Sequence, residues 1–429
     1  MNSIISLKKM YFMIMKVYIF TIAFELPVRY ILSRIHITEF IYIRDIMLIL
    51  GIIIFLLFEK TKKIHLFCCM GFIFFALVGL YFTSNIIEVG MAIKTLLPFY
   101  YGMLLGKYYD KFNLNKEEYL KFLFWGISFG MMLQFIFDDL PWFAMENIKM
   151  LGAEGFMPNQ MLVWLDTELP FTRMSGFCRL YNTTAIYVSY IIIWYIAYKP
   201  NLIYLCVGGV LLIGTLAKTS IGIYALLTTI LIIKYISWRK YILSLKLMLI
   251  FFALNLFLLP LLSLLIISVQ LELDTQIILF LLGGFDDRLV YSWPVTLDNI
   301  ITYGNILLGR GIGGVGLSTT LFDTKLLIKP PIDNFAIFMY GTFGIAGIVL
   351  IIYYLNKVIN MRIKSQLDHF LLLFTFVFFG NAIMADMTDT MSMFLLGIAL
   401  SYICQINNTY RNSCSNDLQG VNNEISSST

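Results

Sequence analysis

The chain has 429 residues, of which 59% are hydrophobic and only 13% are charged. Soluble globular proteins contain about 45–50% apolar and about 25% charged residues, so this composition excludes an ordinary water-soluble fold. The net charge of +5 comes from basic residues scattered between apolar runs, without the basic stripe of a nucleic-acid-binding protein. The composition therefore indicates an integral membrane protein with no nucleic-acid partner.

Apolar runs recur along the whole chain and are long enough to cross the roughly 30 Å hydrocarbon core of a bilayer as helices. The alternating pattern of a membrane β-barrel is absent. We therefore predict an all-α integral membrane protein with about twelve transmembrane helices. In chain order, the predicted spans are Met10 to Phe24, Ile43 to Phe58, Ile64 to Thr83, Ile86 to Gly106, Tyr119 to Phe137, Asn182 to Tyr198, Leu202 to Ala217, Ile221 to Ile236, Leu247 to Val269, Phe335 to Leu355, Phe370 to Ala385 and Met391 to Ile406.

These spans form a single transmembrane domain, residues 1–406. No small-residue cleavage site follows the first apolar run, so we interpret that run as a retained span and not as a signal peptide. The tail, residues 407–429, is rich in Ser and Asn and has no apolar periodicity. This composition predicts a disordered tail.

The distribution of basic residues predicts the orientation in the membrane. Alternate loops counted from Lys8 and Lys9 contain eighteen Lys and Arg residues, whereas the loops on the other side contain eleven. The positive-inside rule therefore places both termini in the cytoplasm. The outer basic residues, among them Arg29, Arg34 and Arg44, run against this rule and need another explanation.

Two predicted outer loops, residues 138–181 and 270–334, are much longer than the others. Within the second loop, the apolar segment Gln276 to Leu282 is too short to span and is predicted to dip into the membrane interface. Asp286 to Tyr303 then has the pattern of an amphipathic helix that is broken at Pro294 and lies along the membrane surface. We expect these two loops to carry the chemistry of the protein.

The first loop ends in Arg173-Met-Ser-Gly-Phe-Cys-Arg179, directly before the sixth predicted span. Two arginines at the membrane boundary suit a phosphate-bearing lipid, because the guanidinium fork matches phosphate oxygens. Snorkelling to ordinary lipid headgroups explains them equally well. Lys218 lies in the tight outer turn between the seventh and eighth spans and could reach the same phosphate, although helix capping by Thr219 or Ser220 also accounts for the hydroxyls there.

The second loop contains Arg288 and the sequence Leu-Gly-Arg310-Gly-Ile-Gly-Gly-Val-Gly. Gly311, Gly313 and Gly316 match the dinucleotide-binding pattern G-x-G-x-x-G. That pattern requires a preceding strand and a following helix in a βαβ unit, which this sequence does not predict. We interpret the glycines as a backbone that bends closely around a ligand near Arg310.

Asp333, at the start of the tenth predicted span, is the candidate general base, because a carboxylate there could face a cavity at the bilayer edge. Capping of the tenth helix is an equally good explanation by position alone. Asp386 and Asp389, between the last two spans, are predicted to lie in a solvated turn. The three histidines, His36, His65 and His369, are not clustered, so we expect no histidine metal site.

Taken in order, these segments resemble the Wzy-type O-antigen polymerases and the related O-antigen ligases. The family's first-loop pattern, approximately Arg-x-Ser-Gly-Phe-Phe-x-Glu-Pro-Asn, matches at Arg173, Ser175, Gly176, Phe177 and Asn182 but departs at Leu180 and Tyr181. The usual Ser-Arg-Thr turn corresponds to Ala217, Lys218 and Thr219, which keeps the cation but not its fork. The second-loop pattern corresponds to Arg288, Trp293, Leu308 to Gly311, Asp333, Asn334 and Gly344 to Gly347.

The resemblance implies a GT-C-like glycosyltransferase that joins oligosaccharide repeat units into O-antigen, capsule or exopolysaccharide on the outer face of the bacterial cytoplasmic (inner) membrane. Glycans linked to undecaprenyl pyrophosphate would be donor and acceptor, transfer would be inverting, and no metal or other cofactor is expected. Membrane lipids and a chain-length regulator are the further partners it implies. The resemblance assigns Asp333, Arg288 and Arg310 to catalysis and Arg173, Arg179 and Lys218 to the pyrophosphate.

Two other functions remain open. Ligases of this family typically have His where this chain has Asp333, which favours the polymerase. A flippase for lipid-linked oligosaccharides would also have about twelve spans, but it would have two related halves and charges lining a central cavity. Lys16, Glu88 and Lys94 are the candidates for such mid-span charges.

Overall fold

The structure is a computed structural model that describes residues 2–58, 63–106, 116–137, 140, 173–265, 284–323, 325–326 and 328–405. Most of the first predicted outer loop, including Lys149, therefore lies outside the described residues. The same holds for the predicted interfacial segment Gln276 to Leu282 and for the predicted tail.

Helices account for most of the described chain, and no strand occurs within it, as predicted from the apolar runs. The helices of the first half are α1 (Asn2–Ala23), α2 (Glu25–Arg34), η1 (Thr38–Tyr42), α3 (Ile43–Phe58), α4 (Lys63–Thr83), α5 (Ile86–Gly106) and α6 (Lys116–Ile136). Those of the second half are α7 (Tyr181–Tyr198), α8 (Leu202–Thr215), α9 (Lys218–Ile236), α10 (Trp238–Ser263), η3 (Arg288–Ser292), α12 (Trp293–Thr302), α13 (Leu317–Phe322), α14 (Phe335–Asn360), α15 (Gln366–Ala382) and a last helix, Thr390–Gln405.

Within the described residues, seven helices are long and apolar enough to cross a membrane, and up to eight if the bent pair α1–α2 counts as one span. The seven lie in α3, α4, α5, α6, α9, α10 and α14. The apolar helices α8, α15 and Thr390–Gln405 are shorter. The fold is thus that of a multi-pass helical membrane protein, whereas twelve crossings stay a prediction.

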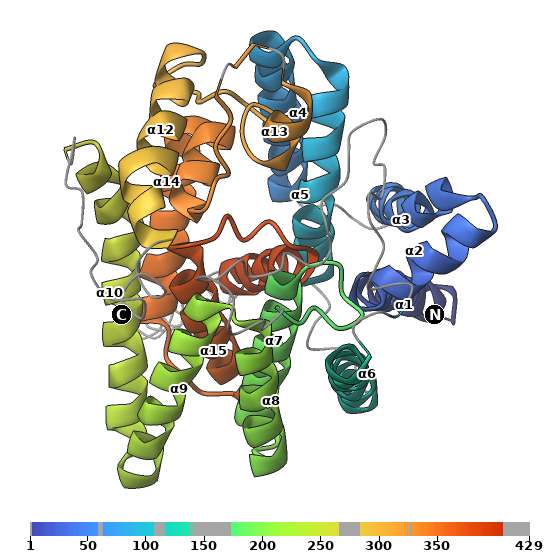
Figure 1. Ribbon diagram of the computed structural model, residues 1–429, viewed down its shortest axis with the longest axis vertical. Helices are drawn as coiled ribbons and strands as arrows, with labels where there is room; N and C mark the ends of the chain where they lie inside the picture. Colours follow the sequence, from blue (N-terminus) through green and yellow to red (C-terminus); the bar gives the residue numbers. More distant parts are fainter. Residues whose placement is uncertain are drawn as a thin grey trace, which may run out of the picture.

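Helix α7 is a predicted span that lies in the interior of the helix bundle. Its side chains from Thr184 to Ala197 are buried on every face, because α7 packs against α6, α8, α9 and α15. A helix that is covered all round belongs to the interior of a bundle. Figure 1 shows α7 to α10 and α15 together in one group, α12 and α14 beside α10, α4, α5 and α13 in a further group, and α1 to α3 with α6 at the edge.

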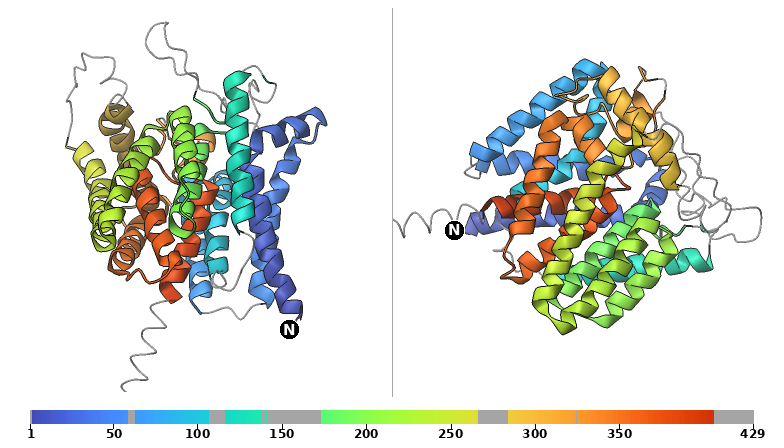
Figure 2. Two further views of the ribbon diagram at one scale, coloured as in Figure 1. Left: turned by 90° about the horizontal axis from the view of Figure 1, so that it is seen from below. Right: turned by 90° about the vertical axis from the view of Figure 1, so that its left-hand side faces the viewer.

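The two ends of the described chain lie on the same side of the molecule. In the left-hand view of Figure 2, the N-terminus and the red end of the last helix are both at the lower side.

The second outer loop enters the bundle through α12 and the glycine-rich segment before α13. A π-helical turn, η3, precedes α12, and Pro294 occupies the first turn of α12. The predicted helix up to Tyr303 is thus present, but it is not broken at its proline: a π-helical turn joins directly to α12. Helix α14 follows and is kinked at Gly344, whose φ of +58° is left-handed, so the chain bends in mid-helix where it meets the loop.

Candidate functional site

The end of the first loop is fixed by backbone hydrogen bonds to two neighbouring elements. The side-chain Oε1 of Gln134 in α6 accepts hydrogen bonds from the backbone N–H of Ser175 at 2.9 Å and of Gly176 at 2.8 Å. The carbonyl of Phe177 accepts from Leu26 N–H in α2 at 3.0 Å. These hydrogen bonds hold the segment in a defined conformation. The backbone positions of Arg173 and Arg179, near its two ends, are therefore fixed.

Arg173 faces the first turn of α7. Its guanidinium lies over the ring of Tyr181, 4.5 Å from the ring centroid, and donates a hydrogen bond to the Tyr181 hydroxyl. Tyr181 is one of the two positions at which the chain departs from the Glu-Pro of the family pattern. In this chain, the residue at that position holds Arg173 by a cation–π contact and a hydrogen bond.

Lys218 is the first residue of α9 and is held beside two other cations. Repulsion from Arg173 and Arg288 acts on its ammonium group, so the three positive charges are close together although they come from three separate segments. The predicted capping by Thr219 or Ser220 is wrong. Ala217 is the N-cap residue and makes no side-chain cap, and Ser220 instead donates to Asn381 Oδ1 at 2.8 Å.

The structure brings together two of the residues predicted to be catalytic. Arg288 Nη2 lies 3.0 Å from Asp333 Oδ2, and their side chains are 25% and 30% exposed. Asp333 does not cap α14, because Asn334 is the N-cap and its side chain accepts from Ile337 N–H at 3.0 Å. Burial raises the pKa of Asp333 above its ordinary value, although the charge and hydrogen bond of Arg288 oppose the rise. Asp333 is thus a half-buried carboxylate whose proton affinity is increased.

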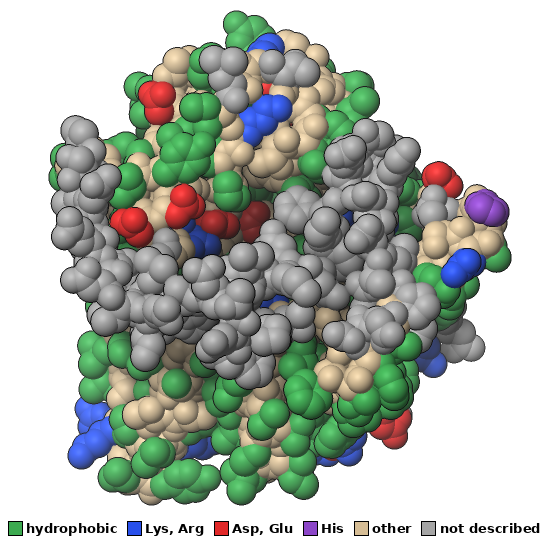
Figure 3. All heavy atoms as spheres, viewed as in Figure 1, with side chains coloured by type: hydrophobic (Ala, Val, Ile, Leu, Met, Phe, Trp, Pro, Cys, Tyr) green, Lys and Arg blue, Asp and Glu red, His purple; other side chains and the backbone are tan. Residues whose placement is uncertain are grey.

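Two further carboxylates lie near Asp333, at the turn before the last helix. Burial raises the pKa of Asp386 to about 6, and the negative charges of Asp333 and Asp389 raise it further, while hydrogen bonds from Thr388 oppose the rise. Burial also raises the pKa of Asp389 to about 6, against hydrogen bonds that include those from Ser392. Figure 3 shows acidic side chains gathered around basic ones in a recess of this face.

These two residues lie in a turn, as predicted, but they are only partly exposed to solvent. Asp389 accepts a hydrogen bond from Ser392 N–H at 3.0 Å, and its other oxygen, Oδ2, is buried. The side chain of Asn334 donates to the carbonyl of Ile383 at 3.2 Å, which ties the start of α14 to the same turn. The sequence contained a signal for the proximity of this turn to Asp333, because both lie on the same predicted side of the membrane. We call Arg173, Lys218, Arg288, Asp333 and Asp386 the Asp333 cluster.

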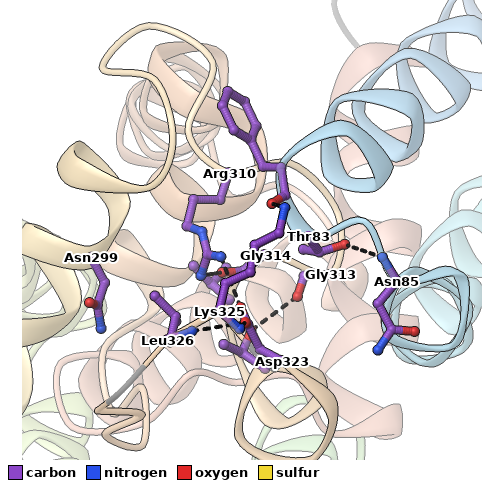
Figure 4. Close-up of polar contacts among 12 residues, drawn as sticks. Thr83, Asn85, Asn299, Arg310, Gly313, Gly314, Asp323, Lys325 and Leu326 are labelled. Carbon is purple, nitrogen blue, oxygen red and sulfur yellow. Dashed lines mark hydrogen bonds and ion pairs between the residues drawn. The ribbon is translucent and has the colours of Figure 1, made fainter.

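Arg310 forms a separate, enclosed ion pair. Its Nη2 lies 2.8 Å from Asp323 Oδ2, its Nη1 donates to the carbonyl of Gly314 at 2.9 Å, and its side chain is 1% exposed. Asp323 also accepts from the backbone N–H groups of Lys325 and Leu326 at 2.7 and 3.1 Å. Figure 4 shows these groups converging inside the loop. The catalytic role assigned to Arg310 stays a prediction, and its observed contacts are those of a residue that holds the loop in shape.

The glycine-rich loop packs against other backbone, not against an open site. Gly311 has φ +78°, and a Cβ there would lie 2.2 Å from the nitrogen of Gly79 in α4. The loop is also bonded to α14 through Arg310 N–H to the Gly341 carbonyl at 2.7 Å. Close bending of this backbone is confirmed, but the neighbours that require glycine are α4 and α14.

Arg179 lies apart from Arg173, in a second polar group. The charges that act on it are those of Glu25, Arg29 and Arg44, and burial is the largest cause that lowers its pKa. The two arginines of the first-loop motif, which the resemblance assigns to one pyrophosphate, therefore belong to different clusters.

A cavity of about 260 Å³ lies between α4, α5, α14, α15 and the last helix. Its walls are apolar and include Phe72, Phe75, Leu96, Phe335, Met339 and Leu400. Phe335 is two residues from Asp333, and Tyr354 lines the cavity nineteen residues further along α14. The cavity thus follows α14 away from the Asp333 cluster and is suited to a hydrocarbon chain.

Within the described part of the chain, no group of three His, Cys, Asp or Glu side chains could hold a metal ion. Comparisons with models of known protein families, with curated proteins and with solved structures give no match for this chain.

Proposed function

We propose that this protein is a glycosyltransferase that polymerises lipid-linked oligosaccharide repeat units. The observation that carries the proposal is the half-exposed pair of Arg288 and Asp333 at the start of α14, beside the cations Arg173 and Lys218. A carboxylate with raised proton affinity and a group of fixed cations are the two components that transfer from a sugar diphosphate requires.

In the proposed reaction, a hydroxyl oxygen of the acceptor sugar attacks the anomeric carbon of the donor glycan. The bond between that carbon and the diphosphate oxygen breaks, and its electron pair leaves with the diphosphate. The hydroxyl proton passes to Asp333. Arg288, Lys218 and Arg173 stabilise the negative charge that develops on the leaving group, and removal of one such partner typically lowers the rate by about 10²–10³.

The apolar cavity beside α14 supports a lipid-linked substrate over a soluble one. Its wall begins at Phe335, directly after the site residues, and its surface is almost entirely apolar. A diphosphate at the Asp333 cluster would leave its hydrocarbon chain at the mouth of this cavity. Burial of each CH₂ group in the cavity contributes about 0.8 kcal/mol to the free energy of binding. Burial of a few isoprene units therefore adds substantially to the affinity.

The finer topology belongs to the same proposal. We infer twelve crossings of a bacterial cytoplasmic membrane in a GT-C-like arrangement, both termini in the cytoplasm, and the Asp333 cluster on the outer side. The loop charge bias supports this orientation, and the common side of the two chain ends agrees with it.

A flippase would carry unpaired charges along a central cavity. Two of the three candidate mid-span charges have partners instead: Lys94 lies 3.4 Å from Asp45, and Lys16 lies over the ring of Tyr119. Glu88 is buried beside Arg310 and Asp323. The 260 Å³ cavity has no charged side chain in its wall. These contacts favour the enzyme over the transporter.

The test is Arg288→Ala and Asp333→Asn, made separately in cells that lack the native protein, with Arg34→Gln as the control because Arg34 is exposed on α2. We expect both site variants to reach the membrane at normal levels and to lose long-chain polysaccharide on a gel, while single repeat units still reach the surface. Normal polymer in either variant would refute the proposal. Long polymer that stays on its lipid carrier would indicate a ligase, and precursor that stays on the cytoplasmic leaflet would indicate a flippase.

A further inference from the structure

Two buried amide side chains, Asn334 and Asn381, lie beside the Asp333 cluster. Asn334 follows Asp333 at the start of α14 and is fully buried, and Asn381 lies near the end of α15 and is 4% exposed. A buried amide is costly unless its donors and its acceptor are hydrogen-bonded. The hydrogen-bond partners of the two amides therefore show which segments they join.

Asn334 joins the start of α14 to two neighbouring elements. Its Nδ2 donates to the carbonyl of Leu256 in α10 at 3.3 Å and to the carbonyl of Ile383 at 3.2 Å, while its Oδ1 accepts from Ile337 N–H at 3.0 Å. The amide thus uses both its donor and its acceptor groups. Ile383 lies three residues before Asp386, so the residue next to the proposed base holds the turn that carries the second acid.

Asn381 joins the end of α15 to the start of α9. Its Oδ1 accepts a hydrogen bond from Ser220 Oγ at 2.8 Å, and its Nδ2 donates to the carbonyl of Val377 in its own helix at 2.9 Å. Ser220 is 4% exposed and lies two residues after Lys218, in the first turn of α9. The same amide therefore ties the segment that presents Lys218 to the segment that leads into the acidic turn.

The turn after α15 has a constrained backbone. Met387, directly after Asp386, has φ +52° and is 1% exposed. A bulky residue in the left-handed region is strained, and such a conformation persists where the surrounding structure imposes it. Burial of the Met387 side chain and the hydrogen bond from Met384 N–H to the carbonyl of Asn381 at 3.0 Å supply that constraint. Asp386 is thus held at one place relative to the two amides.

We propose that Asn334 and Asn381 are positioning residues of the Asp333 cluster. Through the turn after α15, they hold the base Asp333, the acid Asp386 and the ammonium group of Lys218 in one fixed arrangement. The inference rests on the proposed function, in which a base and a cation act on the same glycosyl transfer. A displacement of about 1 Å in a reacting group can cost about 10²-fold in rate, so the two amides affect the rate without contacting the substrate.

The first experiment is a double-mutant cycle with Ser220→Ala and Lys218→Gln. Initial rates of polymer formation are measured on the full-length protein with undecaprenyl-pyrophosphate-linked repeat units extracted from cells that lack it. Ser220→Ala should lower the rate about 3- to 5-fold when Lys218 is present and less than about 1.5-fold in the Lys218→Gln background, because residues that act through each other are not additive. Ser189→Ala is the matched control. Ser189 is a buried serine that bonds within its own helix, to the carbonyl of Ala185 at 2.8 Å, and its substitution should change neither rate.

Asn334→Ser tests the other amide. Serine still caps α14 but lacks the amide donors that bond to the carbonyls of Leu256 and Ile383. We expect kcat per folded molecule to fall about 10- to 100-fold with KM nearly unchanged, because the cations that bind the diphosphate remain. A purely structural role would lower the amount of folded protein, measured by size-exclusion chromatography, and leave kcat unchanged. Where this variant does not fold, the double-mutant cycle decides.

Equal effects of Ser220→Ala in both backgrounds would overturn the inference, as would a wild-type kcat in folded Asn334→Ser protein. The proposed function fails separately, if Arg288→Gln cells still make long polymer. Loss of polymer in Arg288→Gln cells together with additive effects in the cycle would refute the inference alone.

Discussion

Two Arg–Asp pairs in the second outer loop have nearly the same length and opposite surroundings. Arg288 and Asp333 are 3.0 Å apart and about a quarter exposed, whereas Arg310 and Asp323 are 2.8 Å apart and enclosed. Around Asp323, backbone N–H groups and Arg310 occupy the carboxylate. Around Asp333, the structure gives Arg288 as the ion-pair partner, and both side chains are partly exposed among the described residues.

The pKa shifts of the two carboxylates differ in the same way. Burial tends to raise the pKa of Asp323, but the hydrogen bonds from Arg310 and from backbone N–H groups, with the charge of Arg310, hold it below its ordinary value. Burial raises the pKa of Asp333 above its ordinary value despite Arg288. An enclosed carboxylate whose two oxygens both accept hydrogen bonds is a structural element, whereas a partly exposed one with raised proton affinity can exchange partners during a reaction.

The largest expected effect is on the enclosed pair. Asp323→Ala leaves the Arg310 guanidinium buried without its counter-charge, which should destabilise the fold by about 3–5 kcal/mol. Thermal unfolding in detergent and the yield in membranes measure this loss. Asp298→Ala, which removes an exposed carboxylate of α12, is the control and should change stability by less than about 0.5 kcal/mol. An Asp323→Ala protein with wild-type stability would mean that the enclosed pair is not structural.

Arg288→Gln should have the reverse profile. The rate of polymer formation should fall by about 10²–10³, while stability changes by less than about 1 kcal/mol, because a partly exposed ion pair contributes little to folding. Initial rates with lipid-linked repeat units and unfolding curves of the same preparation give both quantities. Equal losses of stability in Arg288→Gln and Asp323→Ala would erase the contrast between the pairs.

The dependence of stability on pH should have opposite signs in the two regions. Asp386 and Asp389 have folded-state pKa values raised to about 6, so the folded protein binds more protons than the unfolded chain, and stability is lost as pH rises from about 4 to about 6. A rise from 3.8 to about 6 corresponds to up to about 3 kcal/mol per group. Asp323, with a lowered folded pKa, contributes stability above its unfolded pKa that is lost as pH falls through the folded pKa.

The variant Asp386→Asn tests whether this carboxyl group causes the loss of stability as pH rises. The variant should lose much of the decline in stability between pH 4 and pH 6 and become more stable than the wild type at pH 7, as measured by thermal unfolding across this range. Asp298→Asn should leave the pH profile unchanged. A profile for Asp386→Asn that parallels the wild type would show that Asp386 is not a buried acid of the Asp333 cluster.

Lys218→Gln should have the smallest effect on activity. An ammonium at the edge of the site interacts through a high effective dielectric and contributes about 1 kcal/mol, so the rate should fall about 5- to 10-fold. The loss should shrink at high salt, because salt screens exposed charges. Lys325→Gln, an exposed lysine outside the cluster, is the control. A loss of rate as large as that of Arg288→Gln would mean that Lys218 stabilises the leaving group as strongly as Arg288 does.

Several features of the site could be predicted from the sequence because their signals are local. The helix around Pro294, the start of a helix just after Asp333 and the close bends at the glycines all appear in the structure, whereas the predicted break at Pro294 does not. The capping alternatives could not be decided, since neighbouring residues compete for one N-cap. Asn334 and Ala217 take those positions, which leaves Asp333 and Lys218 for other contacts.

Other features depend on contacts between distant segments. The motif placed Arg173 and Arg179 side by side, and only the structure separates them into two clusters. Arg29 and Arg44 were exceptions to the positive-inside rule, and their position around Glu25 supplies the missing explanation. Asp386 joins Asp333 because Asn334 bonds to the carbonyl of Ile383, a contact with no local signature.

The sequence by itself determined that the chain is helical and suited to a membrane, because hydropathy acts over a run of neighbouring residues and needs no partner. It also determined which residues carry charge on the side of the long loops. The tertiary structure alone decided which of those charges are neutralised and which are available. The reason is that electrostatic interactions in a low-dielectric interior change by several kcal/mol over a few ångströms, and those distances are set by the packing of helices far apart in the chain.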